Sequence, residues 1–253
     1  MVSASWRALD AELARWRDAG REAQLWWRDD DAARADPALE RLLQLSHESA
    51  TPLALAAVPM AAEAAIFASL PRTVAVLQHG ADHRNRAAEG EKKSEFPESE
   101  DAGSAARRLE AGRARLASLA GARLLPVLAP PWNRFPEARK AALAASGFRG
   151  ISQYGPRAAA MPAPGLRQIN THIDLIAWRG DRGFVGEAQA LEAAVRQLAA
   201  RREGSGDRDE PLGWLTHHAL HDDAAWEFLA LLFERTRVRP GACWSSAEAL
   251  FHT

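Results

Sequence analysis

Two kinds of hydrophobic pattern, short apolar runs and longer amphipathic segments, alternate along this chain. Short apolar runs are typical of buried strands, whereas longer segments with an apolar residue at every third or fourth position are typical of helices that cover a sheet. The predicted strands are residues 25–28, 52–58, 73–78, 124–129, 150–154, 168–178 and 213–217, with residues 213–217 as the final strand. The predicted helices are residues 3–19, a segment that begins at Asp36-Pro37, 61–69, 101–121, a segment that begins at Pro136, 187–202 and 222–237, followed by a short terminal helix capped by Ser245.

This alternation predicts an α/β fold with a mostly parallel sheet of about seven strands. Two polar segments, residues 86–103 and 202–211, interrupt the pattern, but each lies between units of the same alternating kind. We therefore interpret them as surface loops rather than linkers, and we expect a single domain over residues 1–253.

Composition indicates a large core and little net charge. Of the 253 residues, 47% are hydrophobic, and the formal net charge is -1 at pH 7. Such a balance gives no sign of a surface for nucleic acid or an anionic membrane. No run approaches the ~18 apolar residues of a membrane span, and the N-terminus lacks the apolar segment of a signal peptide. Together with the single cysteine, Cys243, these features predict a soluble, cytoplasmic protein.

Residues that can carry chemistry gather where the predicted strands end. In parallel α/β folds the carboxyl ends of the strands form the face on which ligands bind. The sequence therefore predicts one functional site at that face. The residues in question are Asp29, Asp30 and Asp31, then His79 and His83, then Trp132, then Asp174, and finally His217 and His218.

The spacing H-x-x-x-H, from His79 to His83, suits a metal site if a helix begins near His79, because side chains four positions apart share one helix face. Two histidines and one aspartate make a divalent-metal triad with positions left open. The alternative is a pair of surface or core histidines, which an isolated match usually is. The carboxylates at the neighbouring strand end favour the metal site.

Three consecutive carboxylates, Asp29, Asp30 and Asp31, need either solvent or a cation, because like charges repel one another. One alternative is a solvated cluster that caps the helix beginning at Asp36. The pair of tryptophans directly ahead of the cluster favours a buried setting instead. We predict that one carboxylate binds a metal ion and that another takes a proton from the bound water.

The order of these motifs resembles the polysaccharide deacetylase (NodB-homology) superfamily of carbohydrate esterases. The shared features are an aspartate pair, H-x-x-x-H, a Pro-Pro-aromatic turn, D-x-x-x-W and L-x-H, which follow one another over residues 28–218. The runs RDDD and GEKKSEF make a divergent bacterial branch the best match. The resemblance implies a distorted (β/α) barrel, with the N-terminal helix of residues 3–21 packed on it. It also implies metal-dependent removal of an acetyl group from an N- or O-acetylated sugar.

The resemblance also implies how the first two motifs act. Asp31, His79 and His83 would hold one divalent ion, with zinc as the first candidate and cobalt, nickel or iron as the others. Asp30 would be the general base. A register shifted by one residue, in which Asp29 and Asp30 form the pair, stays open.

On the leaving-group side the resemblance makes His217 the general acid, with His218 as its rival or as a substrate contact. Asp174 would orient the acid histidine. Near Trp132 a backbone N–H would hold the oxyanion, and the ring itself would contact the sugar. Asn85 would either bind substrate or cap a turn.

One position departs from the family pattern. The family usually has an arginine ahead of the proline turn, beside the base, and this chain has Ala129 there. Arg28 or Arg134 could replace it, and without a replacement the base would lose the partner that sets its pKa.

The charged segment at residues 89–100 has two interpretations. Its charge pattern favours a solvated loop over a lid that would bring Lys92 and Lys93 to an anionic substrate. For a cytoplasmic enzyme, a nucleotide-linked or lipid-linked sugar precursor, or another small acylated metabolite, fits better than a cell-wall glycan.

Two other function classes remain in view. A catalytically silent carbohydrate-binding protein is suggested by Ala129, but it would not need both the metal ligands and the acid. A non-haem iron oxygenase could use the same triad, but the helical periodicity disfavours the all-β barrel of such enzymes. The sequence does not predict an oligomeric state.

Overall fold

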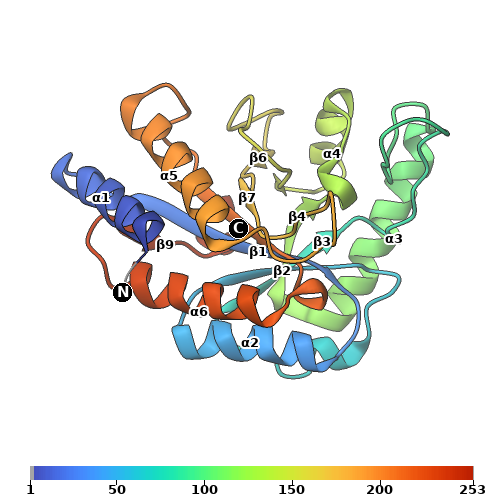
Figure 1. Cartoon of the computed structure of the whole chain (residues 1–253). Helices are drawn as coiled ribbons and strands as arrows, with labels where there is room; N and C mark the ends of the chain where they lie inside the picture. The colour runs from blue at the N-terminus through green and yellow to red at the C-terminus, as the bar shows by residue number, and fades with distance from the viewer. Residues whose placement is uncertain (1–2, 253) are drawn as a thin grey trace.

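Nine strands form one sheet in the computed structural model, which describes residues 3–252. Every pairing between these strands is parallel, and the main path runs in the order β6-β5-β4-β3-β2-β1-β8-β7, with β9 paired to the start of β1. The sheet curls into an open, distorted barrel (Figure 1), so the predicted fold class is confirmed. The strands are β1 Ala23–Ala32, β2 Leu53–Ala57, β3 Val74–His79, β4 Leu124–Ala129, β5 Gly150–Ile151, β6 Arg167–Gln168, β7 Ile173–Asp174, β8 Leu212–Thr216 and β9 Ala242–Trp244.

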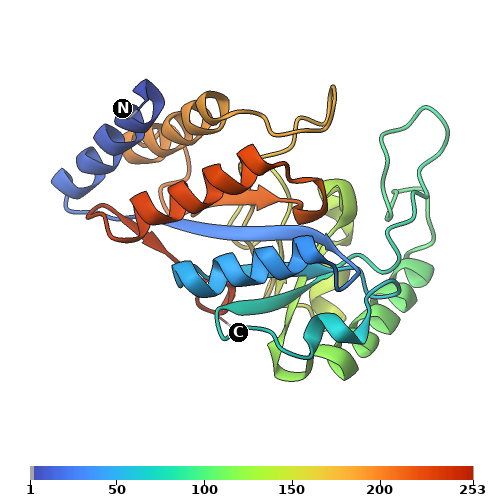
Figure 2. The same ribbon diagram turned by 60° about the horizontal axis from the view of Figure 1, so that its bottom comes forward.

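Helices cover the outer side of this sheet (Figures 1 and 2). The amino end of α2 follows the predicted signal, because Pro37 is its first residue and the carboxylate of Asp36 accepts the N–H of Leu39 at 2.9 Å. At the other side of the molecule α1 packs against α5. The helices are α1 Ala4–Asp18, α2 Pro37–Ser49, α3 Ala102–Ala120, α4 Lys140–Ala145, α5 Glu187–Glu203, α6 Asp223–Arg237 and α7 Ala247–Phe251.

The two faces of β1 separate neighbouring residues, since successive side chains of a strand point to opposite sides. Trp27 packs with the helices outside the sheet, whereas Trp26 packs in the barrel interior against α7. Arg28 and Asp30 share the interior face with Trp26, and Asp29 shares the outer face with Trp27. Two adjacent aspartates therefore lie in different surroundings.

The carboxyl-terminal part of the chain differs from the prediction. Residues 213–217 are not the final strand, because β9 follows α6 and pairs with β1. Only three residues long, β9 has no hydrophobic period that the sequence could reveal. The cap of the last helix is Ser246 rather than Ser245, and its hydroxyl accepts the N–H of Ala249. The predicted strand at 168–178 is divided into the two short strands β6 and β7.

No helix begins at His79, so the helical condition attached to the H-x-x-x-H spacing is not met. His79 ends β3, and residues 80–101 form a long loop beside α3 (Figure 2). Gly80 and His83 have φ angles of 61° and 55°, which belong to the left-handed region and exclude an α-helix. The two histidines are brought together by a turn instead.

The charged part of this loop is only partly a solvated surface. Lys92 and Lys93 are exposed, as the charge pattern predicts, but the next four residues, 94–97, are buried. Phe96 contacts Phe135 at 5.5 Å between ring centroids and belongs to a buried apolar cluster. The loop is therefore anchored at this point.

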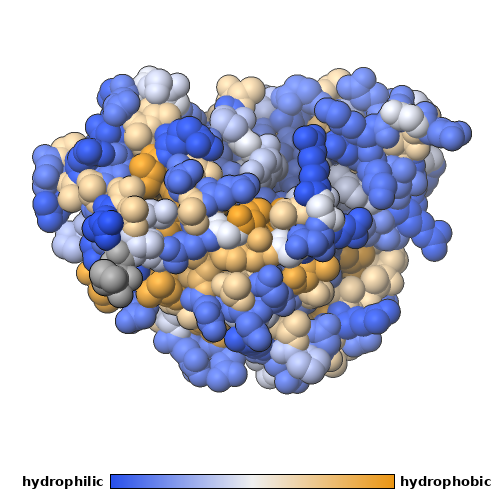
Figure 3. All heavy atoms as spheres, viewed as in Figure 1, coloured by the Kyte–Doolittle hydropathy of each residue, from blue (hydrophilic) through white to orange (hydrophobic). Residues whose placement is uncertain are grey.

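The surface agrees with the amphipathic pattern of the helices. Figure 3 shows hydrophilic side chains over most of one face, with an apolar band across its middle. Helices that cover a sheet turn their apolar side inward and their polar side to water. Within residues 3–252 no helix is long and apolar enough to cross a membrane.

Candidate metal centre and active site

Three side chains from two strand ends meet at the carboxyl edge of the sheet. Oδ1 of Asp31, at the end of β1, lies 3.0 Å from Nε2 of His79 and 3.1 Å from Nε2 of His83. Two ligand atoms that share an ion at about 2.0–2.2 Å are roughly 3 Å apart, so this donor set fits a divalent cation. Among residues 3–252 it is the one cluster of three or more potential ligands this close together.

The backbone at the triad is held in an uncommon conformation. Asp31 has a φ of 70° and His83 a φ of 55°, both in the left-handed region, where aspartate and histidine are enriched. The β1–β2 pairing is also irregular between Asp29 and Ala32. Strain of about 1–3 kcal/mol at such a residue persists where the surrounding structure holds it, and it is common at functional sites.

The electrostatics of the triad favour a cation. Burial raises the pKa of Asp31, but hydrogen bonds from His79 and His83 outweigh it and hold that pKa well below its usual range. Burial lowers the pKa of His79, but the charges of Asp30 and Asp31 outweigh it and raise that pKa. Both shifts reflect the negative charge of the carboxylates beside the histidines, and a bound cation would neutralise that charge and displace the proton from His79.

Asp30 points into the barrel, where it is paired with Arg28. Nε of Arg28 lies 2.8 Å from Oδ1 of Asp30, and Nη2 donates to Oδ2 at 2.9 Å. The remaining donors of the guanidinium reach Ser152 at 2.6 Å and Asn133 at 2.6 Å. The two charged side chains are 0% and 2% exposed, so the pair is fully removed from solvent.

This pair shows which arginine lies beside Asp30 in a chain that has an alanine at position 129. Ala129 is buried in the barrel interior and leaves its position without a charge. Of the two predicted replacements, Arg134 donates to the carbonyl of Lys93 at 2.5 Å, whereas Arg28 contacts Asp30 directly. The arginine beside Asp30 thus comes from β1 itself.

His217 follows β8 and lies close enough to the triad for its charge to lower the pKa of Asp31. Its Nδ1 is 3.8 Å from Oδ1 of Asp174, which is too long for a hydrogen bond but suits an ion pair once the imidazole is protonated. Nε1 of Trp178 donates to Asp174 at 2.7 Å, and its ring stands edge-on to His217 at 4.8 Å. Burial raises the pKa of Asp174, and the charge of His217 only partly opposes this.

His218 is turned to the other side of β1, where it meets Asp29. Nδ1 of His218 lies 2.5 Å from Oδ1 of Asp29, while Oδ2 accepts the hydroxyl of Thr216 and the N–H of His218. Burial raises the pKa of Asp29, but the charge and hydrogen bond of His218, together with the charge of His221 and the hydrogen bond from Thr216, outweigh it and lower that pKa. With Asp29 engaged in this way, the geometry favours the register in which Asp30 and Asp31 form the pair.

Two further predicted residues lie beside the site in different ways. The ring of Trp132 packs on the metal-ligand candidate His83 at 4.6 Å between centroids, and its φ of 55° turns the chain toward the site. Asn85 has its carbonyl oxygen engaged within the loop, where it accepts the N–H groups of Ala87 and Ser94. It therefore acts as the turn cap that the sequence offered as its alternative role.

Several residues that shape the site escaped the sequence analysis. Ser152 and Asn133 accept hydrogen bonds from Arg28. Glu95, inside the charged segment, accepts three N–H groups beside His83. None belongs to a metal-binding or catalytic pattern, and only the GEKKSEF resemblance drew attention to that region.

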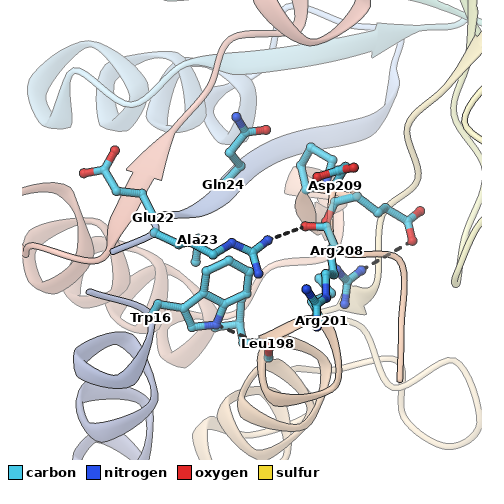
Figure 4. Close-up of a pocket in the computed structure, with 11 residues that line it drawn as sticks. Trp16, Glu22, Ala23, Gln24, Leu198, Arg201, Arg208 and Asp209 are labelled. Carbon is cyan, nitrogen blue, oxygen red and sulfur yellow. Dashed lines mark hydrogen bonds and ion pairs between the residues drawn. The ribbon is translucent and has the colours of Figure 1, made fainter. Parts of the chain in front are cut away.

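A separate cavity of about 170 Å³ lies at the opposite end of the sheet (Figure 4). It is lined at the amino ends of β1 and β8 by Trp16, Arg201 and Glu210 among others. Arg201 and Glu210 form an ion pair of 3.5 Å there, and no predicted site residue lines the cavity. Its place below the barrel and its internal ion pair indicate a structural role.

Comparison with known proteins places this arrangement in a known fold. No protein-family model matches the chain, and no curated protein matches its sequence. A structure assigned as a polysaccharide deacetylase from Mycobacterium smegmatis matches 91% of this chain and 90% of its own, with a TM-score of 0.63 and 16% identity. One from Pseudomonas aeruginosa matches 90% and 89%, with a TM-score of 0.63 and 14% identity.

A third match bears on whether such a barrel is always catalytic. It is a mutant of a carbohydrate esterase family 4 pseudoenzyme with restored enzymatic activity, and it matches 91% of this chain and 67% of its own, with a TM-score of 0.55 and 13% identity. At these identities the matches establish a shared fold. The fold implied by the motif resemblance is therefore confirmed.

Proposed function

We propose that this chain, which has the fold of the polysaccharide deacetylases, is a member of that superfamily and a divalent-metal-dependent hydrolase. Its reaction would remove an acetyl group from an N- or O-acetylated sugar or sugar-linked precursor. The observation that carries the proposal is the triad of Asp31, His79 and His83 between two further groups, the Arg28-paired Asp30 and His217. The residues proposed as ligands, base and acid thus lie at one edge of the sheet.

Asp31, His79 and His83 would hold the ion, for which zinc is the first candidate and cobalt, nickel and iron are the others. A bound divalent ion polarises the acetyl carbonyl and makes a coordinated water more acidic. Two histidines and a carboxylate leave coordination positions open, as a catalytic site requires.

Asp30 would accept a proton from the attacking water. Because Arg28 contacts both of its oxygens, Asp30 is held in one orientation. Ser152 and Asn133 hold the guanidinium in turn, so the base is fixed through Arg28 from the strand end β5 and the turn after β4. This arrangement lets the chain do without an arginine at Ala129.

His217 would protonate the leaving amine or alkoxide, which completes the hydrolysis. Asp174 lies where it can stabilise the imidazolium, and Trp178 holds Asp174 by a hydrogen bond and covers His217 with its ring. Near Trp132 a backbone N–H would stabilise the oxyanion, and its ring would contact the sugar. Asn85 and His218 have no substrate-binding role in this proposal, because the side-chain oxygen of Asn85 and Nδ1 of His218 already have partners within the protein.

The runner-up function is a silent carbohydrate-binding protein. The match to a pseudoenzyme of this fold and the alanine at position 129 favour it. The pairing of Arg28 with Asp30 counts against it, because a binder has no need to orient a buried base. Asp30→Asn separates the two functions: a hydrolase loses turnover, whereas a silent binder keeps its ligand affinity and shows no turnover in either form.

The place of action in this proposal is the cytoplasm, where the one cysteine, Cys243, stays a free thiol. A sugar precursor is then a better substrate than a cell-wall polymer. Finding the protein in the periplasm would overturn this part.

Metal content is the experiment that tests the proposal first. Protein purified without chelators or a His-tag is measured by inductively coupled plasma mass spectrometry, together with Asp31→Asn, His79→Ala and the control His47→Ala on the exposed face of α2. We expect close to one divalent ion per chain in the parent and the control, and loss of the ion in both site variants. Acetate release from acetylated sugars is then measured on the loaded protein. A parent that binds no ion after incubation with zinc or cobalt contradicts the proposal.

A further inference from the structure

Glu95 is a buried acid in an otherwise charged and exposed part of the loop. Its exposed fraction is 0%, although Lys92 and Lys93 just before it lie in solvent. It follows His83 by twelve positions, and the intervening chain bulges away beside α3 (Figure 2). A buried carboxylate is costly unless hydrogen bonds compensate its charge.

That compensation comes from the turn that joins the two histidines. Oε1 of Glu95 accepts the N–H of Ala81 at 2.9 Å and the N–H of Asp82 at 3.2 Å. Oε2 accepts the N–H of His83 at 3.2 Å. One carboxylate thus holds three successive backbone donors, and the last belongs to a candidate metal ligand.

The turn and the carboxylate fit each other closely. A Cβ on Gly80 would lie 2.0 Å from Oε2 of Glu95 and 2.7 Å from Pro131, so only glycine fits there. The φ of Gly80, 61°, also favours a glycine. The left-handed φ of His83 at the other end of the turn requires stabilisation as well, and the bond from its N–H to Glu95 supplies it.

Other contacts hold the backbone of Glu95 and the residue that follows it. The carbonyl of Glu95 accepts from Nη2 of Arg108 on α3 at 3.2 Å, and Phe96 packs in a buried cluster. Arg86 lies 4.0 Å from Glu95 but forms its close ion pair with Asp82, at 2.7 Å. The compensation of Glu95 therefore comes mainly from the three N–H groups of the turn.

We propose that Glu95 is a positioning residue for the metal centre: it holds the 80–83 turn so that His79 and His83 face Asp31 before any ion binds. The inference rests on the proposed function for the identity of the triad. Glu95 contacts neither the ion site nor the reacting atoms, and it acts through the backbone of His83. Removal of such an orienting partner typically lowers metal affinity by about 10–100-fold.

Glutamine tests this role because it keeps the size of the side chain. In either amide orientation its NH₂ group faces at least one backbone N–H of the turn, so donor meets donor. Glu91→Gln is the matched control, since Glu91 is exposed in the same loop and accepts a single backbone N–H, that of Ala88. Glu95→Asp is the second variant: it retains the charge but draws the carboxylate back by one methylene.

The measurement is zinc affinity of the metal-free chain by chelator competition, with thermal unfolding of the same samples with and without zinc. We expect Glu95→Gln to lose about 10–100-fold in zinc affinity and most of the zinc-induced rise in Tm. Glu95→Asp should fall between it and the parent, and Glu91→Gln should match the parent. If Glu95→Gln does not fold, the test rests on Glu95→Asp, and a loss of zinc affinity in that variant supports the inference.

Folded Glu95 variants that bind zinc within twofold of the parent overturn the inference, even if their metal-free Tm is lower, since Glu95 would then serve only the fold. That result leaves the proposed function intact. Conversely, a parent that binds zinc but hydrolyses no acetylated sugar contradicts the proposed function and leaves the affinity comparison valid. A parent that binds no zinc overturns both.

Discussion

Asp29 and His218 form a buried pair on the outer face of β1, with 2.5 Å between Oδ1 and Nδ1. They lie 189 positions apart in the chain, and the parallel register of β1 and β8 brings them together. Their neighbours Asp30 and His217 belong to the candidate active site. The pair therefore fixes the ends of two strands whose next residues would carry the base and the acid.

Histidines 217 and 218 should respond differently to alanine. We expect His217→Ala to lower kcat by about 10²–10⁴-fold with little change in the free energy of unfolding, because the loss is that of a general acid. His218→Ala should instead destabilise the protein by roughly 3 kcal/mol or more, because Asp29 stays buried without its partner. Acetate release and urea unfolding measure the two effects. A His218→Ala protein of parental stability that has lost turnover would show that His218 is the acid.

Arg28 should not tolerate lysine. A lysine ammonium cannot contact both oxygens of Asp30 and also reach Ser152 and Asn133, which the planar guanidinium does. We expect Arg28→Lys to lower kcat by at least tenfold, and Arg28→Met to cost about 3–5 kcal/mol of stability, because Asp30 would be buried unpaired.

Arg134→Lys is the control for Arg28, since Arg134 contacts only a backbone carbonyl of the loop. Its kinetics and stability should stay close to those of the parent. If Arg134→Lys loses activity and Arg28→Lys does not, Arg134 is the partner of the base.

Metal binding should release a proton. The charges of Asp30 and Asp31 outweigh burial and raise the pKa of His79 above 6.5. More than half of the metal-free protein therefore carries this proton at pH 6.5, and zinc must displace it. We expect zinc affinity to rise as the pH rises from 6 to 8. Calorimetry at pH 6.5 in buffers of different ionisation enthalpy should report proton release, and a binding enthalpy independent of the buffer would contradict this prediction.

His172 should weaken the fold in mild acid. Nδ1 of His172 accepts the N–H of Gly213 at 3.1 Å, and Nε2 lies 3.3 Å from Glu210. Burial lowers the pKa of His172 from 6.5, even though Glu210 opposes the shift. Below pH 6.5 the unfolded chain takes up a proton that the folded chain does not, so stability is lost as the pH falls toward the folded pKa.

The comparison that isolates this effect is the difference in unfolding free energy between the parent and His172→Gln at pH 7.5 and pH 5.5. We expect the unfolding free energy of the parent to exceed that of His172→Gln by less at pH 5.5 than at pH 7.5. An advantage that grows in acid would mean that the folded protein holds a protonated His172 paired with Glu210. His47→Gln, at an exposed position, should show no such dependence.

Local patterns along the chain were enough to predict the kinds of elements and the sheet edge where the candidate site residues gather. Apolar runs and helical stripes are local signals, and the cap at Asp36 is read within three residues. Because carboxyl ends of parallel strands lie at one edge, the order of the motifs was enough to bring Asp31, His79 and His83 together. His79 and His83 do lie together, but a left-handed turn rather than a helix face brings them there.

The surroundings of each aspartate depend on contacts between distant parts of the chain. Successive side chains of a strand point to opposite faces, so Asp29 and Asp30 lie on different faces of β1. The sequence does not say which of these faces is the barrel interior. The pairing of β1 with β8 places Asp29 beside His218. The turn after β4 and the end of β5 supply Asn133 and Ser152, which accept hydrogen bonds from Arg28. Glu95 looked like part of a solvated charge run because its three hydrogen bonds depend on a left-handed turn that no local period encodes. Such contacts follow from strand register and backbone conformation, which are settled only when the whole sheet is assembled.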